Sequence, residues 1–424
     1  MQLKSFRDYV DLKQGLAINK GTDYLVSNKK ENEFKIPLLR IADLISGTFS
    51  KFVSEEVNPN VIAGKNDIIY TRTGQIGLAF NGFEGVVHNN SFIVTIKEDK
   101  KGELNQDYLF TVLNSDFVRN QAISLAHSSV QPDLTHEMFK NILFPLPNIE
   151  EQRRIAKIYN ILTRKIDNNK AVCANLESMA KTLYDYWFVQ FDFPDDNGHP
   201  YKTSGGKMEW NETLSREIPV GWEVSKLSQH ISASRGISYS TKMLGEYGIP
   251  MVNLASFGPF GTYKESGIKR YVGKYTLDDT INPYELIMCN TQQTAIKYET
   301  DIIGHAFLMP DIYEGDVVSS HHMTHIHVDN ESLKYYLVRL FNTNYFHRYI
   351  SGHTNGTNIL GLLFSGVEDY TDVIPKQCVL DAFAIRMKSI EQEKSRVIKE
   401  NNKLISLRDC LIPMLMNGQV TFRQ

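Results

Sequence analysis

The chain has 424 residues, of which 42% are hydrophobic and 22% charged, and this ordinary composition excludes disordered and fibrous proteins. The 46 basic and 49 acidic residues give a net charge of −3, which argues against a nucleic-acid binder that works without partners. The charge still permits a DNA reader that shares its phosphate contacts with other subunits.

The cellular compartment of the protein can be inferred from three kinds of sequence signal: signal peptides, membrane helices and disulfide-forming cysteines. The first eight residues carry charges where a signal peptide needs an apolar core. Apolar runs fall well short of the ~18–20 residues of a membrane helix. The four cysteines lie far apart, without a CxxC pair or a disulfide framework. We therefore expect a cytoplasmic protein.

A comparison of the chain with itself shows one unit present twice. Residues 147–188 match residues 375–416 without a gap, so that Pro147 meets Pro375 at a spacing of 228. Shorter matches keep the same order upstream: 14–16 with 235–237, 36–41 with 249–254, 86–89 with 317–320, and 108–109 with 336–337.

The part of each unit before residue 147 or 375 has a mixed pattern. Residues 67–70 predict a strand, which leads through a glycine turn at 71–77 to a second strand at 78–80. Further strands are predicted at 91–96 and 324–328, and helical periodicity is present at 108–122 and 334–349. Residues 191–207 are rich in turn residues and read as a connector.

A long amphipathic helix is predicted after Pro147 and again after Pro375, where the fixed φ of proline is tolerated. Apolar residues recur every seven positions, with a second apolar position four residues later, and this is a heptad seam. The residues expected to pair the helices are Ile155, Leu162, Leu176, Leu183, Phe383, Ile390, Val397, Leu404 and Leu411.

Such a helix needs a partner for its apolar stripe, because about 38 residues would span roughly 57 Å and exceed one small core. The other copy is the nearest partner. Polar residues on or beside the seam, such as Asn169 and Lys394, weaken pairing but can fix its register. The alternative is two separate helices, each packed on its own domain.

Motifs for several enzyme classes are missing. The sequence has neither the glycine-rich cofactor turn nor the Asn/Asp-Pro-Pro-aromatic segment of a methyltransferase. Gly206-Lys207 lacks the earlier glycine of a phosphate-binding loop. A nuclease reading would rest on Asp67 with residues 98–100, which a solvated turn explains more simply.

Histidines gather at 321–327, and a strand would place His325 and His327 on one face, as metal ligands require. The first copy has Asn90, Ser91, Val94 and Ile96 at the matched places, so a metal would belong to one half alone. Structural or DNA-facing histidines are favoured over a metal site.

Polar loops are the better candidates for function, because the major groove is read by Arg, Asn, Gln, Ser and Thr side chains. The candidate DNA-contacting residues are Arg72, Thr73, Gln75, Ser128, Ser129, Gln131, Asn253, Asn290, Gln292, Gln293, His353, Asn355, Thr357 and Asn358. Arg72 lies on a glycine turn, from which its guanidinium is expected to project clear of the domain toward a guanine or a phosphate. The plain alternative is that these are ordinary solvent-exposed loops. The loops differ between the copies while the helices match, and this pattern favours a specificity factor with two readers.

Residues 150–156 (EEQRRIA), after Pro145-Leu146-Pro147, look like the start of the conserved helix in the DNA specificity subunits of type I restriction-modification systems. The segments that resemble a subfamily signature are 186–194 (YWFVQFDFP), 204–208 (SGGKM), 218–219 (IP) and 221–224 (GWEV). Residues 67–69, 72–74 and Gly77 resemble the core of a target-recognition domain. The second copy departs from the pattern, since 285–291 lack the Arg-x-Gly turn and 376–381 lack Glu-Glu-Gln-Arg.

The resemblance implies an α+β chain of two repeated units, each a mixed strand-rich target-recognition domain followed by a long helix, with the helices paired as an antiparallel coiled coil. The implied segments are a first recognition domain at 1–147, a first helix at 148–188, a connector at 189–221, a second recognition domain at 222–375 and a second helix at 376–417.

The implied function is that of a non-catalytic subunit, without a cofactor of its own, that reads a bipartite DNA target. Two modification subunits, which use S-adenosylmethionine, and restriction subunits, which use ATP and magnesium, would complete a site-specific endonuclease and adenine-specific methyltransferase. The alternatives are the specificity subunit of a methyltransferase-only or other multisubunit DNA-modification system, and a structural coiled-coil scaffold. The sequence leaves open which DNA sequence is read and whether a restriction subunit is present.

Overall fold

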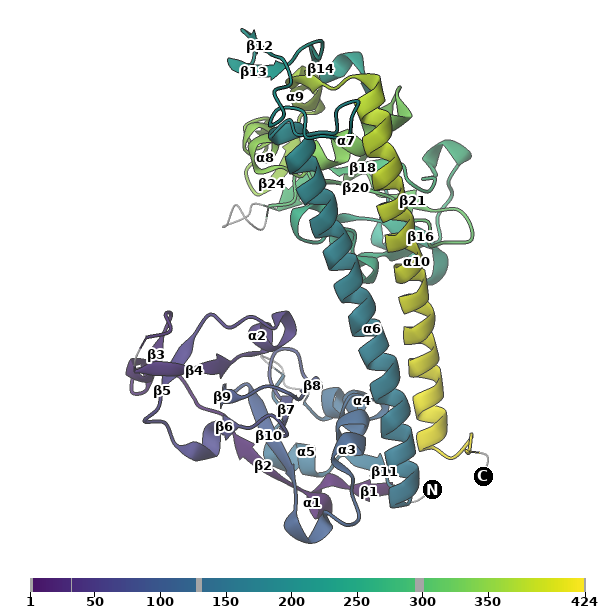
Figure 1. The fold of residues 1–424 in the computed structure, drawn as a ribbon. Helices are drawn as coiled ribbons and strands as arrows, with labels where there is room; N and C mark the ends of the chain where they lie inside the picture. Colours follow the sequence, from purple (N-terminus) through teal and green to yellow (C-terminus); the bar gives the residue numbers. More distant parts are fainter. Residues whose placement is uncertain (1–2, 32, 127–131, 294–300, 423–424) are drawn as a thin grey trace. The chain divides into compact units, whose positions relative to one another are not determined.

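The computed structural model describes residues 3–31, 33–126, 132–293 and 301–422. The chain forms two compact units. Unit 1 contains Met1–Ile166 and Lys403–Gln424, and unit 2 contains Asp167–Asn402. Two long helices contribute to both units, α6 (Ile149–Tyr184) and α10 (Gln377–Met416) (Figure 1).

The main sheet of unit 1 is antiparallel, with the strand order β2-β10-β7-β8. Its strands are β2 (Val10–Gln14), β7 (Ile68–Thr71), β8 (Ala79–Phe80) and β10 (Ser91–Ile96). All four residues of β7 are buried, as expected for an apolar strand in the middle of a core. The strands predicted at 67–70, 78–80 and 91–96 are therefore confirmed.

A second sheet of unit 1 has the order β3-β5-β4-β9-β6 and contains a parallel pair, β4 with β9. Its strands are β3 (Val26–Ser27), β4 (Phe34–Leu39), β5 (Phe52–Ser54), β6 (Ile62–Ala63) and β9 (Gly85–Val87). The short strands β1 (Leu3–Ser5) and β11 (Leu143–Pro145) pair separately, next to the start of α6 in the sequence.

Unit 2 repeats this topology. Its main sheet has the order β15-β22-β18-β20, and a smaller sheet contains the parallel pair β16 with β21. The strands of these sheets are β15 (Ile231–Arg235), β16 (Leu244–Val252), β17 (Lys269–Tyr271), β18 (Leu286–Cys289), β20 (Ala306–Leu308), β21 (Val318–Ser319) and β22 (Met323–Val328). The pair β14 (Glu223–Lys226) with β25 (Thr371–Ile374) takes the place of β1 with β11.

Matching β-bridges confirm the repeat and correct one part of its alignment. Leu16 forms a parallel bridge with His88, and Ile237 forms the equivalent bridge with Ser320. In the parallel pairs, Leu38 lies opposite Val86, and Met251 lies opposite Val318. Val86 therefore corresponds to Val318, and the sequence match of 86–89 with 317–320 was wrong by one residue. Each copy has two consecutive valines here, so only strand pairing reveals the register.

The predicted helical stretches at 108–122 and 334–349 are each two helices. They are α3 (Gln106–Leu113) with α4 (Asp116–Leu125), and α7 (Glu331–Phe341) with α8 (Asn344–Ser351). The second helix of each pair starts at a hydroxyl N-cap, because Ser115 accepts from the N–H of Val118 and Thr343 accepts from that of Phe346. The helical period continues across both breaks, which hid them in the sequence.

The long helices pair in antiparallel fashion, as predicted (Figure 1). In unit 1, Ile155 near the start of α6 shares a core with Ile412 and Leu415 near the end of α10. In unit 2, Asn169 donates to the carboxylate of Glu400 at 3.1 Å. Residue numbers thus rise along α6 as they fall along α10. The alternative of two helices that pack only on their own domains is wrong.

The interface between the two long helices uses both predicted sets of apolar positions, those at every seventh residue and those four residues later. Ile155, Phe383 and Val397 are buried. The other predicted pairing residues are half-buried, namely Leu162, Leu176, Leu183, Ile390, Leu404 and Leu411. The positions four residues later in α6 are buried at Tyr159, Ile166, Ala180 and in the π-helical continuation at Trp187. The centre of the seam therefore lies toward this second set.

The segment after α6 is more ordered than a plain connector. It contains the hairpin β12 (Met208–Asn211) with β13 (Arg216–Pro219). The rings of Phe191 and Phe193 pack against Trp222, with centroids 5.6 and 5.0 Å away. These aromatic contacts attach the segment to the start of the second strand-rich domain.

Candidate nucleic-acid interface

Arg72 follows β7 and is bound on several sides within unit 1. Its Nη2 lies 2.6 Å from Oδ2 of Asp133, and its Nε and Nη1 donate to the carbonyls of Leu134 and Asn89, each at 3.2 Å. The side chain is 14% exposed, and its guanidinium lies 5.4 Å from the ring centre of Phe92. The expectation that this guanidinium projects clear of the domain is wrong, because Asp133 and two carbonyls hold it. A contact of Arg72 with DNA stays a prediction.

The exposed part of this turn lies after Arg72. Thr73 is half-buried and forms a β-bridge with Asp133. Gly74 has a φ of +71°, which favours glycine, and Gln75 is exposed beside it. The backbone oxygen of Gln75 accepts from the hydroxyl of Thr71, so the turn is closed by a side chain. The Gln75 side chain is thus the candidate here that faces solvent.

Ser128, Ser129 and Gln131 lie outside the described residues. The described chain resumes at Pro132 and passes directly beside Arg72, through Asp133 and Leu134.

Asn290 occupies the place of Arg72 in unit 2. The backbone N–H of Arg72 donates to the oxygen of Asn90, and that of Asn290 donates to the oxygen of His322. Their backbone oxygens accept from Leu134 and Leu362 respectively. The second copy therefore lacks the Arg-x-Gly motif at 285–291 because Asn290 stands at the backbone position that Arg72 has in the first copy.

The Asn290 side chain is buried and fully engaged. Its amide nitrogen donates to the oxygen of His321 at 3.2 Å and to the hydroxyl of Thr324 at 3.0 Å, and its oxygen accepts from Thr291 at 2.7 Å. Asn253 is also buried, and its amide nitrogen donates to the oxygen of Gly267 at 2.7 Å. In this structure both asparagines brace loops, and their DNA contacts stay predictions.

A small sheet brings the remaining candidates of unit 2 together. It consists of β19 (Thr291–Gln293), β24 (Ile359–Leu362) and β23 (Thr354–Asn355), in the order β19-β24-β23. Gln292 is buried, and its side-chain oxygen accepts from the N–H of Ile302. Gln293 lies opposite Ile359 in the sheet.

The hairpin β23–β24 carries exposed polar residues at its tip. Asn355, Thr357 and Asn358 are exposed, and Gly356 between them has a φ of +109°. His353, which precedes the hairpin, is half-buried, and its ring packs against that of Tyr349 in a tilted arrangement with the ring centres 4.3 Å apart. This hairpin therefore brings three of the predicted DNA-contacting residues of unit 2 to the surface, and their contact with DNA stays a prediction.

The histidines at 321–327 make contacts with serines. Nε2 of His325 lies 2.6 Å from the hydroxyl of Ser319, and Nε2 of His327 lies 3.0 Å from that of Ser234. Burial lowers the pKa of His325 and favours its neutral form. Within the described ranges, His, Cys, Asp and Glu side chains form no group of three suited to hold a metal ion. Strand register places His325 opposite Ile287, so its counterpart in the first copy is Ile93 rather than Val94.

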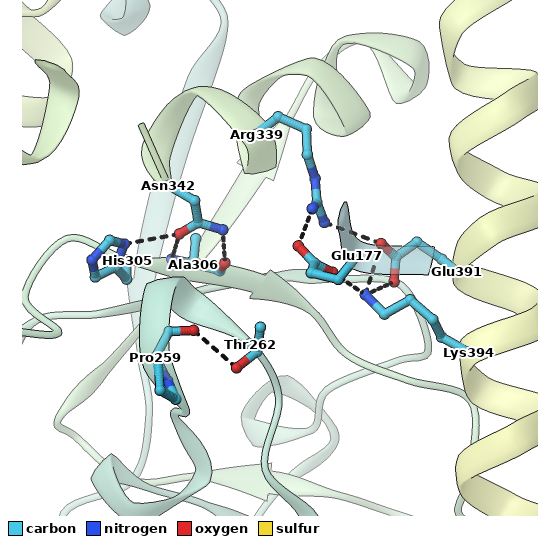
Figure 2. Close-up of polar contacts among 9 residues, drawn as sticks. All are labelled: Glu177, Pro259, Thr262, His305, Ala306, Arg339, Asn342, Glu391 and Lys394. Carbon is cyan, nitrogen blue, oxygen red and sulfur yellow. Dashed lines mark hydrogen bonds and ion pairs between the residues drawn. The ribbon is translucent and has the colours of Figure 1, made fainter. Parts of the chain in front are cut away.

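A network of four charges, two of them buried and two half-buried, was missed in the sequence. It joins Glu177 of α6, Arg339 of α7, and Glu391 and Lys394 of α10 (Figure 2). Arg339 contacts Glu177 and lies 3.1 Å from Glu391, and Lys394 lies 2.7 and 2.9 Å from the same two carboxylates. The side chain of Arg339 is 7% exposed. The two positive and two negative charges balance, and they tie the second strand-rich domain to both long helices.

The network shifts the pKa of Glu177 and that of Lys394 toward the charged form. Burial alone would raise the pKa of Glu177, but the charges of Arg339 and Lys394 outweigh it and lower this pKa to about 2. Burial would lower the pKa of Lys394, yet Glu391 and Glu177 raise it above its ordinary value. Glu177 and Lys394 therefore stay charged at neutral pH.

Replacing Arg72 tests its structural role. We expect Arg72→Ala to lower the free energy of unfolding of unit 1 by about 1–3 kcal/mol, because two carbonyls and the Asp133 carboxylate lose their donors. Arg72→Lys should restore little, since an ammonium cannot form the same fork. Denaturant unfolding measures the loss, with the exposed Arg153→Ala as control. A loss equal to that of the control would contradict the structural role.

The described helices include none that is both long and apolar enough to cross a membrane.

Comparisons with known proteins agree on one family. Residues 8–178 match the family model of the type I restriction modification DNA specificity domain. The MjaVIII specificity subunit of a type I restriction enzyme from Methanocaldococcus jannaschii is 23% identical over 408 residues, which cover 95% of this chain and 90% of that protein. The MjaIX specificity subunit of the same organism is 22% identical over 358 residues, covering 84% and 78%. The crystal structure of a type I restriction-modification S subunit from M. genitalium has a TM-score of 0.56 at 13% identity, covering 98% of this chain and 95% of that one, and it shows a shared fold.

Proposed function

Because this chain belongs to the family of type I restriction-modification DNA specificity subunits, we propose that it selects the DNA sequence on which the other subunits of such a complex act. It reads a bipartite target, one half with each strand-rich domain. Members of this family are generally non-catalytic, and the assembled complex would act as a site-specific endonuclease and adenine-specific methyltransferase.

One observation supports the proposal: the same backbone position leads into different polar loops in the two copies. In unit 1, the Arg72 turn lies beside the loop residues Asp133 and Leu134, and Thr73 forms an isolated β-bridge with Asp133. In unit 2, Asn290 leads into β19, which pairs with the exposed hairpin β23–β24. A shared frame with unlike polar loops is what reading two different half-sites requires.

The chemistry of the complex is assigned to the partners. Two modification subunits would supply S-adenosylmethionine-dependent methylation, and restriction subunits would use ATP and magnesium. The partners would also supply many phosphate contacts, which accounts for a DNA reader with a net charge of −3.

Methylome sequencing tests the proposal. A host that expresses this chain with its modification subunit is expected to carry methylated adenines in one split sequence motif. Expression of the modification subunit alone is the control and should leave that motif unmethylated. Methylation without a split motif, or the same motif in the control, would contradict the proposal.

A further inference from the structure

The turn that connects β21 to β22 consists of Ser320, His321 and His322, and it holds polar atoms without partners. Oγ of Ser320 and Nδ1 of each histidine are buried and meet no hydrogen-bond partner within the described ranges. The large majority of buried polar side-chain atoms are paired, so open atoms on consecutive residues single this turn out. The proposed function leaves its two histidines without a role.

The two imidazole rings lie together, and each can offer one donor. Their centres are 3.9 Å apart, and both residues are half-buried. A neutral imidazole carries its proton on one ring nitrogen. A proton on Nδ1 would be a buried N–H without an acceptor, so the proton belongs on Nε2, which is outside this buried set. Burial, and then the charges of His321 and Lys269, lower the pKa of His322 and favour its neutral form.

Lys269 on β17 brings a positive charge to this turn. Its Nζ donates to the hydroxyl of Tyr239 at 3.1 Å and lies 5.5 Å from the centre of that ring. The ring of Tyr239 lies in turn 6.1 Å from that of His321. Because Lys269 donates to a phenol rather than to a carboxylate, its charge stays available to an anion. The same charge opposes a metal ion at the two imidazoles.

The turn is bonded directly to the start of a predicted recognition loop of unit 2. The backbone N–H of Asn290 donates to the oxygen of His322. The side-chain nitrogen of Asn290 donates to the oxygen of His321 at 3.2 Å. A ligand held by this turn would therefore lie next to the residues expected to meet the second half-site.

Unit 1 has the lysine but a different turn. The backbone N–H of Leu38 donates to the oxygen of Lys51, and Met251, the counterpart of Leu38, lies opposite Lys269. Lys51 therefore corresponds to Lys269. Two asparagines at 89–90 stand where unit 2 has the two histidines, as the matching β-bridges show. A positive charge beside this turn thus belongs to both copies, while the paired imidazoles belong to the second copy alone.

We propose that Lys269, His321 and His322 bind a phosphate group of the DNA backbone beside the second half-site. This inference rests on the proposed function, and it gives unit 2 a contact that holds DNA without reading its sequence. A phosphate oxygen accepts from N–H groups and carries the negative charge that complements the lysine. A base edge would also accept from the imidazoles, but it offers the lysine no charge.

Binding of the complex reconstituted with the modification subunit tests the contact on two duplexes, one with the methylated motif and one of unrelated sequence. Lys269→Gln and the double variant His321→Ala with His322→Ala should each weaken binding to both duplexes by the same factor, about tenfold. Lys269→Gln should also lower the salt slope by about one unit. The controls, which should bind as the wild type does, are Lys226→Gln and His327→Ala, an exposed lysine and an exposed histidine of the same unit.

A histidine footprint locates the contact in the wild-type complex, so it decides the question even if a variant fails to fold. Diethyl pyrocarbonate modifies accessible histidines, and mass spectrometry identifies the modified residues. Either duplex should protect His321 and His322 and leave His327 reactive. Inorganic phosphate, at the same concentration of phosphate groups, should protect none of them.

The outcomes separate this inference from the proposed function. Weaker binding to the motif duplex alone would indicate base reading and overturn the phosphate contact. Full affinity of both variants, or a turn that neither duplex protects, would overturn it while leaving the proposed function in place. Protection by inorganic phosphate equal to that by DNA would make free phosphate the ligand and overturn the inference. A wild-type complex that binds neither duplex would contradict the proposed function itself.

Discussion

Arg339→Leu is expected to lower the free energy of unfolding of unit 2 by about 3–5 kcal/mol, because it leaves the buried carboxylate of Glu391 and the half-buried carboxylate of Glu177 to share one cation of the network, Lys394. Denaturant unfolding measures this loss. Arg396→Leu is a matched control, since Arg396 pairs with Glu393 on the same helix but is 62% exposed, and it should cost about 0–1 kcal/mol. An equal loss in both variants would contradict a partly buried network.

Two further measurements identify the cause as charge. Replacing Glu177 and Glu391 with Leu and Arg339 and Lys394 with Met removes every charge, so this variant should lose less stability than Arg339→Leu alone. The pKa of Glu177 is lowered from 4.5 to about 2, so the stability it contributes is present above pH 4.5 and is lost as the pH falls toward 2. The difference between the wild type and Arg339→Leu should therefore shrink over this pH range.

Exchange of residues 1–147 for the first domain of a relative with a different target is expected to change one half of the methylated motif and leave the other half unchanged. Each mismatched base pair costs roughly 1–3 kcal/mol of binding, so several mismatches in one half-site should abolish methylation of the original motif. Methylome sequencing of cells with the chimera and the modification subunit measures both halves. A change in both halves together would contradict two independent readers.

The reciprocal exchange, which replaces residues 222–375, should give a stable chimera only under one structural condition. The incoming domain must provide an arginine at the place of Arg339, because Glu177, Glu391 and Lys394 belong to the helices that remain. The first domain carries no such condition, since Thr111 stands 228 residues before Arg339. A chimera without this arginine should unfold at lower denaturant concentration than one that keeps it.

The sequence by itself determined the architecture, because its signals are periodic and local. Heptad spacing placed α6 and α10, apolar runs placed β7 and β10, and the spacing of 228 revealed two copies. The sequence alignment of β9 with β21 was wrong by one residue, because two consecutive valines in each copy satisfy either alignment.

Only the tertiary structure decided which polar side chains are available. Arg72 is held by Asp133, 61 residues away, and Asn290 by His321 and Thr324. A residue's type shows that it can donate a hydrogen bond, but its partner comes from a distant segment that folding brings near. For the same reason Lys394, a polar residue beside a seam in the sequence, is one of four charges in a partly buried network.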